Sequence, residues 1–306
     1  MANPAFRNNP AFTNNPNRAQ SWNTPQQGQF GQFQPQGGQQ PYGQQPVQGQ
    51  PYGQAPSAQD LNAMYDRPSA TARETGRMSI DGTIMKTALT LGVVALGFVA
   101  TLAVFFAGLA IPFYTMTYGG LAVGFVLGLV NAFKREPNRT LILLYALGQG
   151  MFLGGISATL EWGSGFDGII FQALLATACV FAATLALYSF RIVRTSPRMN
   201  KIFFIVIIGY GLFSLVNLGL MLTGVSTDPW GLRSAEIFGI PLGVLLGGLA
   251  VLLGAYSLVM DFEMTENGVK RGAPAKYEWS AAFGITVTII WLYIEILRII
   301  AILRQR

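Results

Sequence analysis

A single glutamate interrupts the apolar run WLYIEILRII, which extends from Trp291 to Ile300. Arg298 follows Glu295 three residues later, and this spacing places the two side chains on one face of a helix. A carboxylate or a guanidinium near the centre of a bilayer costs about 2.5 to 3.5 kcal/mol on insertion scales. We therefore expect both groups to face protein, water or each other, and not lipid.

Two interpretations of Glu295 stay open. In the first, Glu295 and Arg298 form a local ion pair that neutralises itself and has no further function. In the second, Glu295 forms a proton- or cation-responsive gate with another carboxylate, because two acids that share a buried site cannot both ionise cheaply. Asp261, in the segment LVMDFEMTENGV, is the candidate partner, with Glu263 and Glu266 just beyond it. The alternative for these three acids is a solvated helix end.

Most familiar site chemistry is excluded by composition. The chain contains no histidine, which excludes a Ser-His-Asp triad, a His-ligated zinc and a His-bound haem. Its one cysteine, Cys179, cannot form an internal disulfide. No GxxxxGK[ST] pattern is present to couple ATP hydrolysis to transport. We expect a protein that is not an enzyme, that needs no cofactor, and that has no metal site assignable from sequence.

The apolar runs predict a membrane protein. Hydrophobic residues make up 51% of the chain and charged residues 11%. Runs of about 20 residues recur, the length that a helix needs to cross roughly 30 Å of hydrocarbon. Glycines four residues apart in several runs predict close helix packing. The expected fold is an all-α seven-transmembrane helix bundle. Thr288 and Trp291 lie on the same face of span seven as Glu295 and Arg298, which gives this span a polar stripe, so we expect it to be the central helix. The spans are predicted at Ala88 to Leu109, Ile111 to Phe133, Thr140 to Leu160, Gly168 to Phe190, Ile202 to Thr223, Ile237 to Met260 and Ser280 to Leu303.

Basic residues alternate between the connecting loops. The loops after spans two, four and six carry three, four and three basic residues, ten in all, whereas the loops after spans one, three and five carry only Arg233. Cytoplasmic loops are enriched in lysine and arginine, so the pattern predicts a cytoplasmic N-terminus and an external C-terminus. The terminal Arg304 and Arg306 oppose this orientation. The net charge of +6 is thus interpreted as a topology signal, and no nucleic-acid partner is expected.

The first part of the chain differs from the rest. Residues 1–57 are rich in Asn, Gln, Gly and Pro and contain no acidic residue, and no secretory signal opens the chain. Such a segment buries too little apolar surface to offset its ordering entropy. We expect residues 1–78 to form a disordered cytoplasmic tail and residues 79–306 to form the membrane domain. A weak interaction segment is the alternative for the tail.

Several stretches resemble the Bax inhibitor-1 family, also called the transmembrane Bax inhibitor motif family. They are YALGQGMFLGG in span three, AYSLVMDFEM at the end of span six and AAFGITVTIIWLYIEILRIIAIL in span seven. The likeness extends from about Ser79 to the end. MSIDGTIMKTALTL and GAPAKYEWSAAFGITVTIIWLYIEILR are similar to the branch found in actinobacterial-type bacteria, which implies a multi-pass protein of the bacterial inner membrane.

The resemblance implies a fold and a function. In the fold of this family, six helices enclose the seventh. The better understood members of the family are proton-sensitive calcium leak pathways governed by two membrane aspartates. The matching positions are Asp261 and Glu295. The chain departs from the family pattern in two ways. The second acid is a glutamate instead of an aspartate, and the segment between the two acids is longer than expected for the family. With a turn at Gly272 to Pro274, the acids differ in height by roughly 15 Å in a regular hairpin, so direct contact is not expected.

The expected function is a pH-sensitive cation leak, with calcium favoured, or a regulator of ion homeostasis. Arg298, Glu263 and Glu266 are expected to support the gate that Asp261 and Glu295 form. The expected partners are the lipid bilayer, a transiently bound cation and a membrane protein partner. The alternative is a membrane interaction protein that modulates a membrane protease or a stress response.

Overall fold

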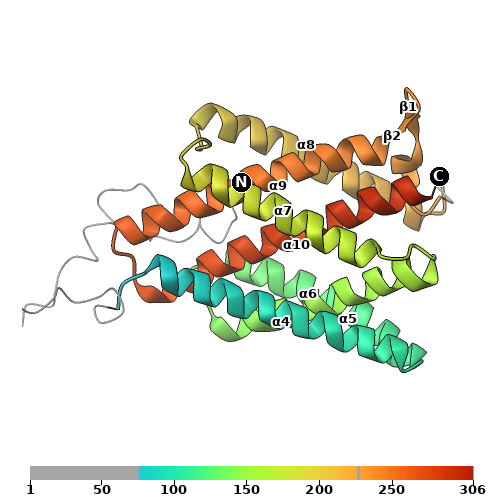
Figure 1. The fold of residues 1–306 in the computed structure, drawn as a ribbon, viewed down its shortest axis with the longest axis horizontal. Helices are drawn as coiled ribbons and strands as arrows, with labels where there is room; N and C mark the ends of the chain where they lie inside the picture. The colour runs from blue at the N-terminus through green and yellow to red at the C-terminus, as the bar shows by residue number, and fades with distance from the viewer. Residues whose placement is uncertain (1–75, 226–227, 306) are drawn as a thin grey trace, which may run out of the picture.

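The structure is a computed structural model that describes residues 76–225 and 228–305. Among these residues, seven helices are long and apolar enough to cross a bilayer, which confirms the predicted fold class. They lie side by side along one common direction (Figure 1). Their bounds are α4 (Ile80–Phe106), α5 (Ala110–Phe133), α6 (Arg139–Ala158), α7 (Ile169–Ser189), α8 (Pro197–Leu222), α9 (Leu242–Lys270) and α10 (Glu278–Arg304).

Two of the predicted spans need correction at their ends. Helix α4 begins at Ile80 and not at Ala88, because Ser79 caps it by accepting a hydrogen bond from the Gly82 amide. The predicted start of span six, Ile237, lies in a short hairpin made of β1 (Glu236–Ile237) and β2 (Ile240–Pro241). Helix α9 instead runs from Leu242 to Lys270, ten residues beyond its predicted end, because its acidic end is packed against neighbouring helices.

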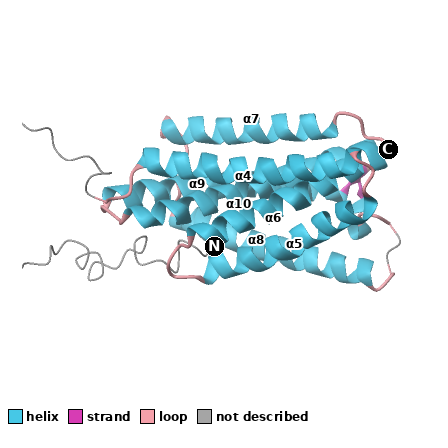
Figure 2. Ribbon diagram, turned by 90° about the horizontal axis from the view of Figure 1, so that it is seen from below, coloured by secondary structure: helices cyan, strands magenta, loops and turns pink. Residues whose placement is uncertain are grey.

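Helix α10 is the central helix of the bundle. It contacts α4, α6, α7 and α9, and most of its side chains between Ser280 and Leu297 are buried. Figure 2 shows α10 in the middle of the bundle, with α7 and α5 toward its outer sides. Helix α8 is the opposite case, since only Phe203 and Asn217 are buried along it. The prediction that span seven is sheltered by the other spans is confirmed.

Glycines allow α4 and α6 to pack at backbone distance. A Cβ atom added at Gly150 would lie 2.1 Å from the carbonyl oxygen of Val94, and one at Gly97 would lie 2.6 Å from that of Leu147. Neither backbone can move away without separating the helices. This contact fixes α6, which in turn holds Tyr145 beside α10.

The chain enters α4 through a packed junction. The amide of Met78 donates to the carbonyl of Ala273 at 2.6 Å, and the amide of Ala275 donates to the carbonyl of Gly76 at 2.9 Å. The Met78 side chain is buried. Residues 76–78, which the predicted boundary assigns to the tail, are therefore packed against the α9–α10 connection. The remainder of that predicted disordered tail, residues 1–75, lies outside the described residues.

Candidate ion and proton site

The polar side chains of α10 lie at two positions along the helix, which we call the first and the second level. Thr288, Trp291 and Glu295 follow one another at spacings of three and four residues, which keeps them on one side of the helix. Seven residues separate Thr288 from Glu295, and at about 1.5 Å per residue this is roughly 10 Å. The first level is nearer the N-terminal end of α10, and the second is nearer its C-terminal end.

Asp261 forms the first level. Its side chain is fully buried between α9 and α10, and the Thr288 hydroxyl lies 2.8 Å from Oδ2. Oδ1 has no hydrogen-bond partner among the described residues. The same Thr288 hydroxyl lies 3.2 Å from the carbonyl of Gly284, yet it has one proton to donate. Thr288 can donate to an ionised Asp261, or accept a hydrogen bond from a neutral Asp261 while it donates to the carbonyl of Gly284.

Glu295 forms the second level and is surrounded by donors. Its Oε1 accepts hydrogen bonds from the Tyr210 hydroxyl at 2.5 Å and the Trp291 indole at 3.2 Å. Arg298 donates to both carboxylate oxygens, at 3.0 Å and 2.9 Å. The predicted local pair with Arg298 is present, although it is only one part of a larger network. Indole and guanidinium groups cannot accept a hydrogen bond, so this site suits an ionised carboxylate.

A second arginine, Arg233, completes this network. It lies in the short 3-10 helix η4 (Gly231–Ser234), is only 5% exposed, and places Nη1 4.0 Å from Glu295 Oε2. Its Nη2 donates to Ser214 Oγ at 2.8 Å, and both terminal nitrogens donate to the Tyr210 hydroxyl at 3.2 Å. Two guanidinium groups therefore face one carboxylate.

Sequence reasoning missed Arg233 and Tyr210 as site residues. A signal for Arg233 existed, because it is the one basic residue in loops that the topology rule leaves without positive charge. Tyr210 carries no such signal, since tyrosine is common in membrane helices. The loop that holds Arg233 is itself anchored by Asp228. Hydrogen bonds from the Ser234 hydroxyl and the Trp230 amide lower the pKa of Asp228 below its usual range.

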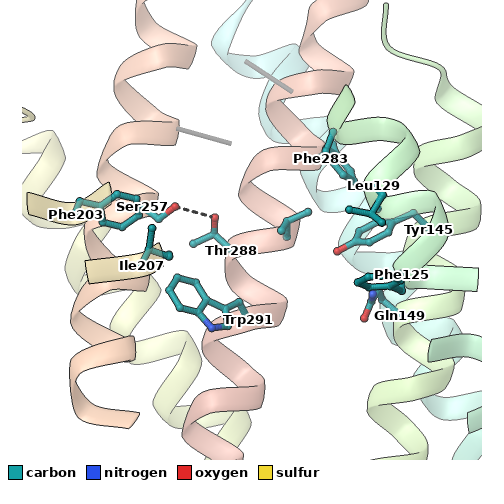
Figure 3. A pocket seen from close by; sticks show the side chains of 14 residues that line it. Phe125, Leu129, Tyr145, Gln149, Phe203, Ile207, Ser257, Phe283, Thr288 and Trp291 are labelled. Atoms are coloured by element: carbon teal, nitrogen blue, oxygen red, sulfur yellow. Dashed lines mark hydrogen bonds between the residues drawn. The ribbon is translucent and has the colours of Figure 1, made fainter. Parts of the chain in front are cut away.

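One cleft beside α10 is lined by a neighbour of each acid. It has a volume of about 340 Å³, with α5 and α6 on one side, α8 and α9 on the other, and α10 at its base (Figure 3). Thr288, the partner of Asp261, and Trp291, a partner of Glu295, both line it. Other polar lining groups belong to Tyr145, Gln149 and Ser257. Both acids thus have one neighbour on a shared cleft.

The structure does not bring the two predicted gate acids together. Asp261 bonds to Thr288, whereas Glu295 lies about two helical turns further along α10 and bonds there to Tyr210 of α8 and to Arg298. This separation agrees with the expected absence of direct contact. The offset of roughly 10 Å along α10 is smaller than the 15 Å expected, because the connection between α9 and α10 is longer than the assumed turn and α10 begins only at Glu278.

The other predicted acids lie elsewhere. Glu263 accepts hydrogen bonds from the amide and hydroxyl of Thr195, and Glu266 accepts one from the Tyr188 hydroxyl and pairs with Lys270 at 2.5 Å. Both acids join the end of α9 to the region where α7 meets α8. Neither contacts Asp261. No group of three or more acidic, histidine or cysteine side chains that could hold a metal occurs among the described residues.

The bundle with its enclosed polar helix defines a multi-pass membrane protein. A family model described as "Bax inhibitor 1 like" matches residues 3–305. The chain belongs to this Bax inhibitor-1-like family, and the match begins well before Ser79, where the visible resemblance starts. Searches of curated proteins and of solved structures found no significant match.

Proposed function

We propose that the protein is a pH-sensitive pathway for cations, with calcium favoured, in which Asp261 is the proton-responsive carboxylate. The observation that carries the proposal is the burial of this acid inside seven membrane helices with one oxygen unpartnered. A buried charge without a partner is costly, so such a group alternates readily between a neutral state and a cation-bound state. Carboxylate oxygen is also a suitable ligand for a hard cation such as calcium.

Thr288 supports this role because it can serve both states of Asp261. Its hydroxyl donates to Asp261 or to Gly284, and its distance to the Ser257 hydroxyl is 3.5 Å. A single acid with hydroxyl neighbours makes a weak and transient cation site, which fits a leak better than a storage site. The hydroxyls of Thr288 and Ser257 add polar groups next to the acid.

Glu295 acts differently in this proposal. Two guanidinium groups surround it, so with the carboxylate ionised the level carries a net positive charge. Such a level repels a cation that approaches Asp261 from the C-terminal end of α10. Glu295 and its arginines therefore form the barrier of the pathway, and a rearrangement of Arg233 or Arg298 opens it. We place this end outside the bacterial inner membrane and the N-terminus in the cytoplasm, as the loop charges favour.

The test is calcium flux into proteoliposomes at external pH values from about 6 to about 8, the interval in which a buried acid can change its charge. The parent protein should conduct more as the pH rises, because ionised Asp261 attracts the cation. Asp261→Asn copies the neutral acid and should give low flux at every pH. Glu295→Gln should change the amount of flux while its rise with pH remains.

Glu266→Gln is the matched control, because this acid lies on the same helix and outside the Asp261 site. It should keep the parent response. If Asp261→Asn retains the same pH response as the parent, Asp261 is not the proton-responsive group. Equal flux in protein-free liposomes would reject conduction altogether.

A further inference from the structure

We propose that the cleft between α5 and α8 binds an acyl chain of a bilayer phospholipid, with the ester carbonyl accepting a hydrogen bond from Tyr145. The mouth of the cleft lies on helices whose outer faces are apolar and exposed. On α5, Phe125 is 62% exposed and Leu129 is 45% exposed, and both line the cleft. In a membrane, such side chains contact lipid, so lipid is the molecule that reaches this opening.

The lining is suited to an uncharged chain. Its walls include Phe203, Ile207, Phe283 and Val287, and none of its lining residues carries a charge. The volume of about 340 Å³ falls within the range of small-molecule sites, and so it can hold part of a chain but not a charged headgroup. The lining on α10 extends from Phe283 to Trp291, which is about 12 Å along the helix. The cleft therefore has the length and polarity of a chain segment.

An unsatisfied hydroxyl identifies the polar end of the site. Tyr145 is only 4% exposed and lines the cleft, its hydroxyl makes no hydrogen bond to another described residue, and its oxygen keeps some access to the cleft. Figure 3 shows this oxygen pointing from α6 into the space beside α10. Its ring packs on Phe283, with centroids 5.0 Å apart, so the hydroxyl is held in place. A donor that faces the cleft without a protein partner can be satisfied by a carbonyl oxygen from the ligand.

Tyr145 lies toward the N-terminal end of α6. It is six residues, or about 9 Å, from the start of α6 at Arg139. Arg139 lies over the ring of Trp279 at 5.6 Å, and aromatic and basic residues of this kind mark the membrane interface. The ester is then near Tyr145, and the chain extends along α10 over Thr288. If the proposed function is correct, this chain seals the Asp261 site from the side, but the lipid site itself does not depend on conduction.

The test uses protein in nanodiscs of phosphatidylcholine that contain a phosphatidylcholine with a diazirine on one chain. After illumination, peptide mass spectrometry should find adducts on Val287 and Thr288, which lie on the central helix away from bulk lipid. Two separate variants fill the cleft, Leu129→Trp from α5 and Ile207→Trp from α8. Each folded variant should lower these adducts at least fivefold, while labelling of the exposed Phe171 on α7 stays unchanged.

A second comparison tests the polar contact. An ether-linked diazirine lipid lacks the carbonyl, so the parent should be labelled about two- to tenfold more by the ester lipid, as expected for one hydrogen bond. Tyr145→Phe should abolish this preference and retain the adducts. Absence of adducts on α10, or unchanged adducts in both filled variants, would overturn the lipid site. An equal ester preference in Tyr145→Phe would overturn the Tyr145 contact.

Discussion

Replacement of Glu295 by glutamine should destabilise the protein through both Arg298 and the more deeply buried Arg233. The glutamine keeps the volume of the side chain and removes the charge that two guanidinium groups face. Arg233 Nη1 lies 4.0 Å from Glu295 Oε2, and at an effective dielectric constant of about 20 two unit charges at this distance attract each other by ~4 kcal/mol. Hydrogen bonds from Arg233 to Tyr210 and Ser214 remain, so we expect a loss of about 3 kcal/mol in the free energy of unfolding.

A double-mutant cycle isolates this interaction. Arg233→Gln should cost a similar amount, but the double variant with Glu295→Gln should cost less than the sum, with a coupling of about 2 kcal/mol. The free energies come from unfolding in mixed micelles at increasing fractions of SDS. The control cycle uses Glu266→Gln and Lys270→Gln, a pair with an exposed lysine and a half-buried glutamate that should couple by less than about 0.5 kcal/mol. Additive costs for Glu295 and Arg233 would refute the proposed charge network.

Further predictions concern packing, the junction and the tail. Gly150→Ala should destabilise the protein by about 1 to 3 kcal/mol, because the new Cβ meets the backbone of α4. The control, Gly209→Ala, adds a Cβ in open space on α8 and should be neutral or stabilising. Thermal unfolding of both variants measures the difference. Glu278→Ala removes the acceptor of the Ser79 amide and the partner of Lys86, so it should cost about 2 kcal/mol and speed hydrogen exchange at the start of α4. Glu136→Ala, in an exposed pair, should cost less than about 0.5 kcal/mol. Deletion of residues 1–75 should leave calcium flux intact; flux that disappears would show that the deleted segment is needed for conduction.

The bundle could be predicted because each helix carries its own signal. Span length, apolarity and loop charge are local properties of the sequence, and they identified all seven helices. The polar stripe on α10 also indicated its central position, since charge cannot face lipid. The start of α4 and the end of α9 were less predictable. The Ser79 cap determines where α4 begins, and the packing of its acidic end determines where α9 ends.

The site could be predicted only in part. The two acids stand out from their apolar surroundings, but their partners depend on contacts between distant segments. Tyr210 reaches Glu295 from α8, and Arg233 reaches it from the connection before α9. Thr288 was placed on the correct face, although its bond to Asp261 depends on how α9 and α10 are offset. Such offsets follow from the packing of all the helices.

The proton exchange of Asp261 can be measured directly by infrared difference spectroscopy of the reconstituted protein between about pH 5 and about pH 9, a range that includes strongly shifted buried acids. The parent should show a band of a protonated carboxyl group that disappears as the pH rises. Asp261→Asn should lack this band, and Thr288→Val should shift it, because the valine cannot hydrogen bond to the acid. Identical difference spectra for the parent and Asp261→Asn would contradict the assignment of Asp261 as the proton-responsive group.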